Sequence, residues 1–106
     1  MIVVTSETIA NKRIVKTLGL VRGNTVRARH IGKDIMAGLR NIVGGEVHEY
    51  AKLIAESREQ TLDRMTRDAA ELGANAIIAT RFTTSVMMGG AAELLAVGTA
   101  VIVEDV

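Results

Sequence analysis

The clearest pattern of hydrophobic and polar positions lies between residues 46 and 72. Apolar residues recur there with the spacing of one face of an α-helix; they are Val47, Ala51, Ile54, Leu62, Met65, Ala69 and Leu72. Gly73 follows at once, where a glycine commonly ends a helix. The other side carries opposite charges four positions apart, in the pairs Asp63–Arg67, Arg64–Asp68 and Arg67–Glu71. The pattern predicts one long amphipathic helix.

Strand-like patterns precede this helix. Residues 2–5 (IVVT) form a short β-branched run, and residues 14–29 form a longer one. Gly23-Asn24 interrupts the longer run, and it is either a two-residue hairpin turn or a bulge in one long strand. A turn region separates the two runs, and Asn11 is the residue there best able to adopt a left-handed conformation.

The C-terminal third predicts a β-hairpin. Residues 74–88 and 91–104 flank Gly89-Gly90, a pair typical of tight turns. Counting outward from a two-residue turn places Val86 opposite Glu93. Both faces of the last strand are apolar, with Leu94, Ala96 and Ile102 on one and Leu95, Val97, Val101 and Val103 on the other. One helix covers only one face of a small sheet, so the other face is expected to meet another subunit.

A short helix is predicted near residues 33–43 and is ended by Gly44-Gly45. Together these elements predict a single α+β domain over residues 1–106, with two layers: an antiparallel β-sheet, and one long and one short helix. The long helix would span roughly 40 Å. A compact chain of this length has a diameter of only about 33 Å. The helix would therefore overhang a compact monomer, which again favours a homo-oligomer.

Composition narrows the classes of chemistry. The chain has no cysteine, which excludes disulfides, thiolate nucleophiles and thiolate metal sites. The N-terminal residues lack the basic and apolar regions of a signal peptide, and no apolar run approaches the roughly 20 residues that cross a bilayer. We expect a cytoplasmic protein without a membrane partner.

The net charge is +1, but the charges are unevenly distributed. Residues 12–40 contain eight lysines and arginines against the acid Asp34, whereas residues 41–72 contain seven acids against four bases. Such a distribution attracts either a copy of the chain or an anionic ligand. The basic segment includes Arg22, Arg27 and Arg29. No aromatic side chain lies near them to stack on bases, which argues against nucleic acid as the partner.

Several long strings carry a family resemblance: LGLVRGNTVRAR (18–29), IGKDIMAGLRNIVGGE (31–46), ESREQTLDRM (56–65), LGANAI (72–77) and GAAELLAVGTAV (90–101). They resemble the YbjQ-type family of small bacterial and archaeal proteins, which carries a heavy-metal-binding label, and the resemblance covers essentially the whole chain. It implies a dodecin-like α+β subunit and a ring-like homo-oligomer, a pentamer or a multiple of one.

The chain departs from the family pattern at two places. Ala10-Asn11 stands where Pro-Gly is common, which is a conservative exchange in a turn. Val97 stands where the family commonly has a tyrosine. Any family-wide site that depends on that phenol is therefore absent from this chain.

Glu46, His48 and Glu49 are the candidates for a metal site. Two carboxylates three positions apart on a helix could supply oxygen ligands to a hard or borderline ion. However, Lys52 stands where a zincin helix has its second histidine, and no thiolate is available for a soft metal. The ligand spacing therefore does not support a metal ion. Acids are also favoured in a first helical turn by the helix dipole alone.

Arg58 falls where the apolar stripe of the long helix predicts a hydrophobic residue. A charge aimed at a core or interface must be paired, and Glu93, Glu46 and Glu49 are the candidate partners. In the structural interpretation, a paired arginine fixes the helix on the sheet. In the functional one, arginine and glutamate hold a small carboxylate or phosphate in a cleft between subunits.

These observations lead to one hypothesis and two alternatives. The first is a homo-oligomeric binding or scaffold protein that holds a small anionic ligand between subunits; the candidate ligand-binding residues are Arg22, Arg27, Arg29, Glu46, Glu49, Tyr50, Arg58 and Glu93. The alternative is a metal-binding protein that uses Glu46, His48 and Glu49. An enzyme is favoured least, because no nucleophile–base pair or reaction-specific motif is visible.

Overall fold

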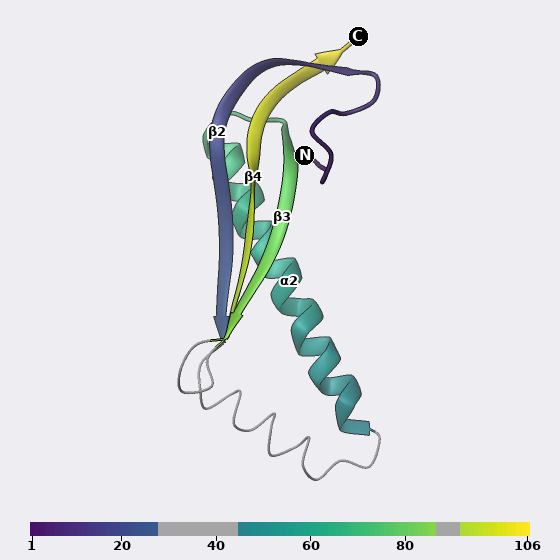
Figure 1. Cartoon of the computed structure of the whole chain (residues 1–106), viewed down its shortest axis with the longest axis vertical. Helices are drawn as coiled ribbons and strands as arrows, with labels where there is room; N and C mark the ends of the chain where they lie inside the picture. Colours follow the sequence, from purple (N-terminus) through teal and green to yellow (C-terminus); the bar gives the residue numbers. More distant parts are fainter. Residues whose placement is uncertain (28–44, 87–91) are drawn as a thin grey trace.

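The computed structural model describes residues 1–27, 45–86 and 92–106. Its elements are β1 (Ile2–Val3), β2 (Lys12–Arg27), α2 (Gly45–Glu71), β3 (Ala76–Val86) and β4 (Ala92–Asp105) (Figure 1). The predicted short helix near 33–43 and the turn at Gly89-Gly90 lie outside the described residues. The α+β class and the long helix are confirmed.

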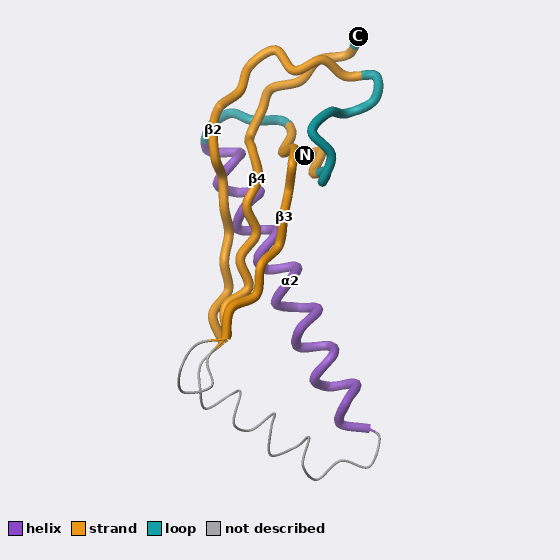
Figure 2. Tube along the Cα trace, in the orientation of Figure 1, coloured by secondary structure: helices purple, strands orange, loops and turns teal. Residues whose placement is uncertain are grey.

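The strands form one sheet in the order β1-β3-β4-β2. β4 pairs antiparallel with both β2 and β3, whereas β1 runs parallel to β3. The sheet is therefore mixed, and the prediction of a purely antiparallel sheet was wrong. The reason is that β1 and β2 lie at opposite edges, so the N-terminal segment must cross the end of the sheet between them (Figure 2).

β2 is one continuous strand through Gly23-Asn24, which form neither a turn nor a bulge. Gly23 pairs with Ala96, and Asn24 pairs with Leu95; the register shifts of this strand fall between Ile14 and Lys16 and between Thr17 and Gly19. The glycine is needed because α2 passes directly over it. A Cβ atom at Gly23 would lie 2.3 Å from the carbonyl oxygen of Thr61 and 2.5 Å from the backbone nitrogen of Met65.

The hairpin of β3 and β4 is confirmed, but its predicted register is wrong by one residue. Val86 pairs with Ala92, and it is Ser85 that pairs with Glu93. The predicted register pairs residues whose numbers add up to an odd number, whereas the numbers of the observed partners add up to an even one. A further register shift lies between Ile78 and Arg81.

α2 lies across one face of the sheet and forms the main core there (Figures 1 and 2). Its buried positions recur every four residues, at Ser57, Thr61, Met65 and Ala69. The two apolar members pack with residues of all three long strands, namely Val21, Ile77, Ala96 and Ala100. Leu72 is 48% exposed, so it lies outside the core, contrary to the predicted stripe. Gly73 has a φ of 87° and ends the helix as predicted.

Within the described ranges, the opposite face of the sheet is covered at the end where the N-terminal segment lies. The N-terminal segment places Ile9 against a second core cluster that contains Ala76, Val101 and Val103. This segment also adopts the predicted left-handed conformation at Asn11, with a φ of 63°. Within the described ranges, α2 does not have the apolar length that a membrane crossing requires.

Candidate functional site

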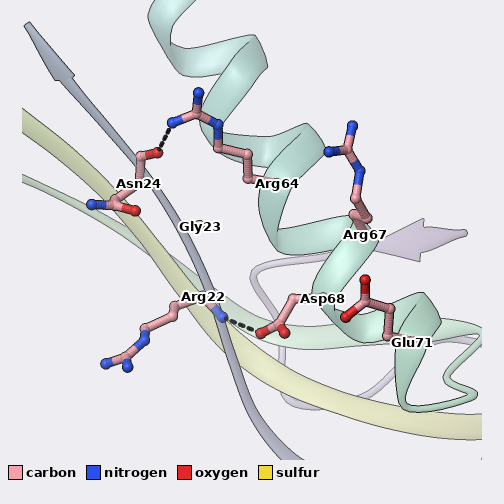
Figure 3. Close-up of a pocket in the computed structure, with 7 residues that line it drawn as sticks. All are labelled: Arg22, Gly23, Asn24, Arg64, Arg67, Asp68 and Glu71. Atoms are coloured by element: carbon pink, nitrogen blue, oxygen red, sulfur yellow. Dashed lines mark hydrogen bonds between the residues drawn. The ribbon is translucent and has the colours of Figure 1, made fainter.

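A groove of about 330 Å³ lies between α2 and the edge strand β2 (Figure 3). Its lining residues other than glycine are polar or charged; they are Arg22, Gly23, Asn24, Arg64, Arg67, Asp68 and Glu71. The groove includes the point at which the bare backbone of Gly23 lets the helix approach the strand closely. This is the candidate functional site.

Two side chains of α2 form hydrogen bonds with backbone groups at the edge of β2. Arg64 Nη1 donates a hydrogen bond to the carbonyl oxygen of Asn24 at 2.6 Å. The backbone N–H of Arg22 donates to Oδ2 of Asp68 at 3.3 Å (Figure 3). An edge strand has no further strand to satisfy these groups. A guanidinium and a carboxylate four positions apart on the helix supply the missing donor and acceptor instead.

This arrangement corrects the predicted charge pairs along the helix. Among the described residues the ion pairs are Lys12–Asp105 and Arg13–Glu104, and neither involves α2. Exposed pairs on one helix contribute little. The backbone of β2 offers Arg64 and Asp68 partners at the strand edge, and so these side chains reach across to the sheet.

Arg67 is the unsatisfied cation of the groove. It is exposed, and within the part of the chain that the structure describes it makes no recorded hydrogen bond or ion pair. Its neighbour in the lining, Arg64, adds a second guanidinium three positions away (Figure 3). The same holds for Glu71, whose carboxylate has no recorded partner there. The groove therefore contains the guanidinium of Arg67 and the carboxylate of Glu71, beside the two side chains that bind the edge of β2.

Of the predicted ligand-binding residues, Arg22 reaches the groove through its backbone. Its guanidinium points away from Arg64 and Arg67 (Figure 3). Glu93 lies on the face of the sheet opposite α2 and accepts a hydrogen bond from Nδ2 of Asn24 at 3.1 Å. The structure thus separates Glu93 from the helix by the thickness of the sheet.

Arg58 does not occupy the core position that the helical stripe suggested. Ser57 is fully buried there, whereas Arg58 is exposed. The buried row follows a four-residue spacing that passes through position 57, so the prediction placed the core one residue too late. Because Glu93 lies on the far face of the sheet, a buried pair between Arg58 and Glu93 does not form in this chain.

The remaining predicted residues are placed only by their backbone or not at all. Arg27 ends β2, and residues 46–50 lie in the first turns of α2, which begins at Gly45. The side chains of Arg27, Glu46, His48, Glu49 and Tyr50 lie outside the described set, as does the whole of Arg29.

The described side chains do not fit a heavy-metal site. No group of three histidine, cysteine, aspartate or glutamate residues gathers among them. The chain also lacks cysteine altogether, so the thiolate ligands that soft metals prefer are absent.

Sequence reasoning missed Arg64, Arg67 and Asp68 as site residues, because their charges suggested pairing along the helix. The available signal was Gly23. A glycine inside a strand marks close approach of another backbone, and charged residues on the approaching helix then become candidates for the edge of that contact.

Comparison with known proteins gives consistent matches over the whole chain. A family model described as "Putative heavy-metal-binding" matches residues 1–104. Among curated proteins, a UPF0145 protein of Dehalococcoides mccartyi is 59% identical over 104 residues, covering 98% of this chain and 100% of that protein. One from Methanosarcina acetivorans is 56% identical over 101 residues, covering 95% of each chain.

Among solved structures, a protein of unknown function of the DUF74 family from Pediococcus pentosaceus is similar in fold. The TM-score is 0.64, the identity is 14%, and the match covers 98% of each chain. At that identity the likeness concerns the fold alone.

Proposed function

The chain belongs to the YbjQ family, as its sequence predicts, and from the structure of its groove we propose the following function. The chain is a homo-oligomeric binding module, and the groove between β2 and α2 holds a small anion with a carboxylate or phosphate group. The observation that carries this proposal is the free guanidinium of Arg67.

The chemistry of the groove favours a small anion over a polymer. Guanidinium groups bind carboxylate and phosphate oxygens through paired, charge-assisted hydrogen bonds. Arg64 and Arg67 lie three positions apart in one lining, so one anion can contact both. Asp68 and Glu71 stand beside them and would repel an extended chain of phosphates. The site therefore suits one anionic group.

The homo-oligomer rests on surfaces that a single chain leaves uncovered. Leu20 is 69% exposed and Val26 is 49% exposed on the sheet face opposite α2. The family resemblance implies a pentamer or a multiple of one. Multi-angle light scattering of the purified chain tests this part, and a monomer at micromolar concentration would contradict it.

The anion site is tested by titration with inorganic phosphate and with citrate, following the backbone amide signals of Gly23 and Asn24 by NMR. We expect saturable shifts at these two amides. Arg67→Gln should weaken the affinity by about tenfold or more, which corresponds to the loss of one hydrogen bond to a charged group.

Arg58→Gln is the matched control. It removes the same charge from an exposed arginine of the same helix, nine positions away and hence on the opposite side of α2. Its affinity should equal that of the unchanged chain. Equal affinities for Arg67→Gln and the unchanged chain would contradict the proposal. Stoichiometric metal in protein purified without chelator would instead support the metal-binding alternative at Glu46, His48 and Glu49.

A further inference from the structure

Among the residues that the structure describes, none covers the sheet face opposite α2 beyond the reach of the N-terminal segment. Strand pairing places Leu20, Asn24 and Val26 of β2 on this face, beside Leu95 and Val97 of β4. Leu20 and Val26 are among the most exposed large apolar residues of the described chain. Exposed apolar surface of this kind marks an interaction site.

The first part of α2 extends beyond the sheet of its own chain. The recorded hydrogen bonds between α2 and the sheet begin at Ser57, whose carbonyl oxygen accepts from Thr25 at 3.1 Å. Thr25 lies two residues before the end of β2. Residues 45–56 therefore continue past the end of the sheet, where Figure 1 shows the helix projecting beyond the strands. The sequence nevertheless carries the apolar spacing of the helix into this part, through Val47, Ala51 and Ile54.

The two surfaces match in length. Twelve helical residues span about 18 Å. The uncovered stretch of β2 from Leu20 to Val26 spans about 20 Å. One such helical segment would thus cover the uncovered stretch of sheet along its length.

The two surfaces also match in charge. Residues 45–56 contain Glu46, Glu49 and Glu56 against one lysine, Lys52. The sheet face carries the arginines Arg22 and Arg81 against one acid, Glu93, among the described residues. The guanidinium of Arg81 also donates hydrogen bonds to the carbonyl oxygens of Thr5 and Thr80. Opposite charges around an apolar centre are typical of a specific interface, where they select the partner and its orientation.

We propose that residues 45–56 of α2 in one copy of the chain pack on the sheet face of the next copy, over Leu20, Val26, Leu95 and Val97. This inference rests on the proposed homo-oligomer and adds the surfaces that form it. Each copy gives its helix to one neighbour and its sheet to another. Such a contact is heterologous, and it produces a closed ring when the rotation between copies closes.

Cysteine cross-linking tests the contact cleanly, because the chain has no cysteine of its own. Chains with Leu20→Cys and chains with Ile54→Cys are mixed, allowed to exchange subunits, and treated with a short bismaleimide. We expect covalent dimers that contain one chain of each kind. A chain carrying both changes should give a ladder of covalent multimers, because every copy then has both partners.

Leu72→Cys is the matched control for the helix position, since Leu72 is 48% exposed just past the opposite end of α2. Mixed with Leu20→Cys, it should give no covalent dimers. Dimers from Leu20→Cys alone would show sheet packed on sheet, and would overturn the proposal. Absence of dimers in the Leu20→Cys and Ile54→Cys mixture, with the native mass still oligomeric, would overturn it as well and leave the homo-oligomer standing. A monomeric native mass of the unchanged chain would overturn both.

Discussion

Gly23 shows how one residue sets the position of a whole helix. The backbone of α2 lies so close that a single methyl group would collide with main-chain atoms of Thr61 and Met65. Gly98 is also close to its surroundings, but the nearest atom there is Cγ2 of the Ile77 side chain, at 2.6 Å. The buried side chain of Ile77 can shift only within the core, whereas the two main-chain segments at Gly23 must separate.

Gly23→Ala is therefore expected to lower the free energy of unfolding by about 3 kcal/mol, at the upper end of what overpacking usually costs. Gly98→Ala is the comparison and should cost less, about 1 kcal/mol. Urea denaturation of the two variants measures the difference. A Gly23→Ala variant as stable as the unchanged chain would contradict the close backbone contact between α2 and β2.

Asp105 provides a residue-scale prediction in acid. It forms an ion pair with Lys12, and the hydrogen bond and charge of Lys12 hold the pKa of Asp105 below its ordinary value of 3.8. The folded-state pKa thus lies below that of the unfolded chain. The pair stabilises the fold fully above about pH 4, and this contribution is lost as the pH falls through the lowered pKa.

We expect Lys12→Gln to remove this part of the pH dependence. Its free energy of unfolding should differ from that of the unchanged chain above pH 4 and converge with it in stronger acid. The effect should be small, because Asp105 is well exposed. Arg58→Gln, which removes a charge without an ion pair among the described residues, should shift stability equally at all pH values. Identical pH profiles for Lys12→Gln and the unchanged chain would contradict the role of the pair.

At the residue scale, the sequence predicts conformation better than contact. Asn11 and Gly73 have the backbone conformations expected of them, because those depend on the residue itself. The burial of Ser57 in place of Arg58 depends on how the helix is rotated on the sheet. A small polar residue in a core row carries no hydrophobic signal, so the stripe could not be continued through it.

At the scale of elements, a small hydroxyl cluster joins α2 to β2. Thr25, Ser57 and Thr61 are all buried. Thr61 Oγ1 donates to the carbonyl oxygen of Ser57 at 2.8 Å, and the hydroxyl groups of Thr25 and Thr61 contact each other. A strand and a helix thus share hydrogen bonds inside the core, next to the close contact at Gly23.

Thr25→Val and Thr61→Val should each lower the free energy of unfolding by about 1–2 kcal/mol, because each removes the contact between the two hydroxyl groups and one of the two hydrogen bonds from them to the carbonyl oxygen of Ser57. The double variant should cost less than the sum of the two, since it removes both hydroxyl groups of the shared bond. Chemical denaturation of the four chains in this cycle measures the coupling. Thr66→Val, at a half-buried position of the same helix, is the control and should change little. Additive costs would show that the two hydroxyls are independent.

The existence of the elements follows from the sequence pattern, but their register does not. Local spacing predicts the two strands that flank Gly89-Gly90 and the helix that ends at Gly73. It does not predict the parallel pairing of β1, because that pairing depends on where the chain crosses the sheet. Likewise, the hairpin register depends on the number of residues in its connection, and a shift of one residue is invisible in a strand that is apolar on both faces.

At the scale of the molecule, the fold is elongated. The chain measures 55 × 26 × 18 Å and has a Cα radius of gyration of 17.1 Å. A compact chain of this length would have about 13 Å. The overhang of the helix that its length predicts is therefore present in the single chain. In the proposed homo-oligomer, the surface that meets this part of the helix belongs to a neighbouring copy, and a pattern within one chain does not specify it.

Leu20→Lys places a charge on the exposed sheet face and should reduce the native mass to that of a monomer. Because the fold of one chain does not depend on this position, the monomer should retain its shape. Small-angle X-ray scattering should then give a radius of gyration near 17 Å. Leu72→Lys should leave the native mass unchanged. A monomer near 13 Å would contradict the projecting helix.

The contacts of Arg64 and Asp68 with the edge of β2 also have a consequence for solubility. A long edge strand with unpaired backbone groups is a template on which other strands can add without limit. Here one guanidinium and one carboxylate take the place of the next strand at Arg22 and Asn24 of that edge. The guanidinium of Arg64 also belongs to the proposed anion site. The same side chain therefore both protects the strand edge and binds the anion. A ligand that pulls Arg64 away from Asn24 would therefore expose the strand edge to aggregation.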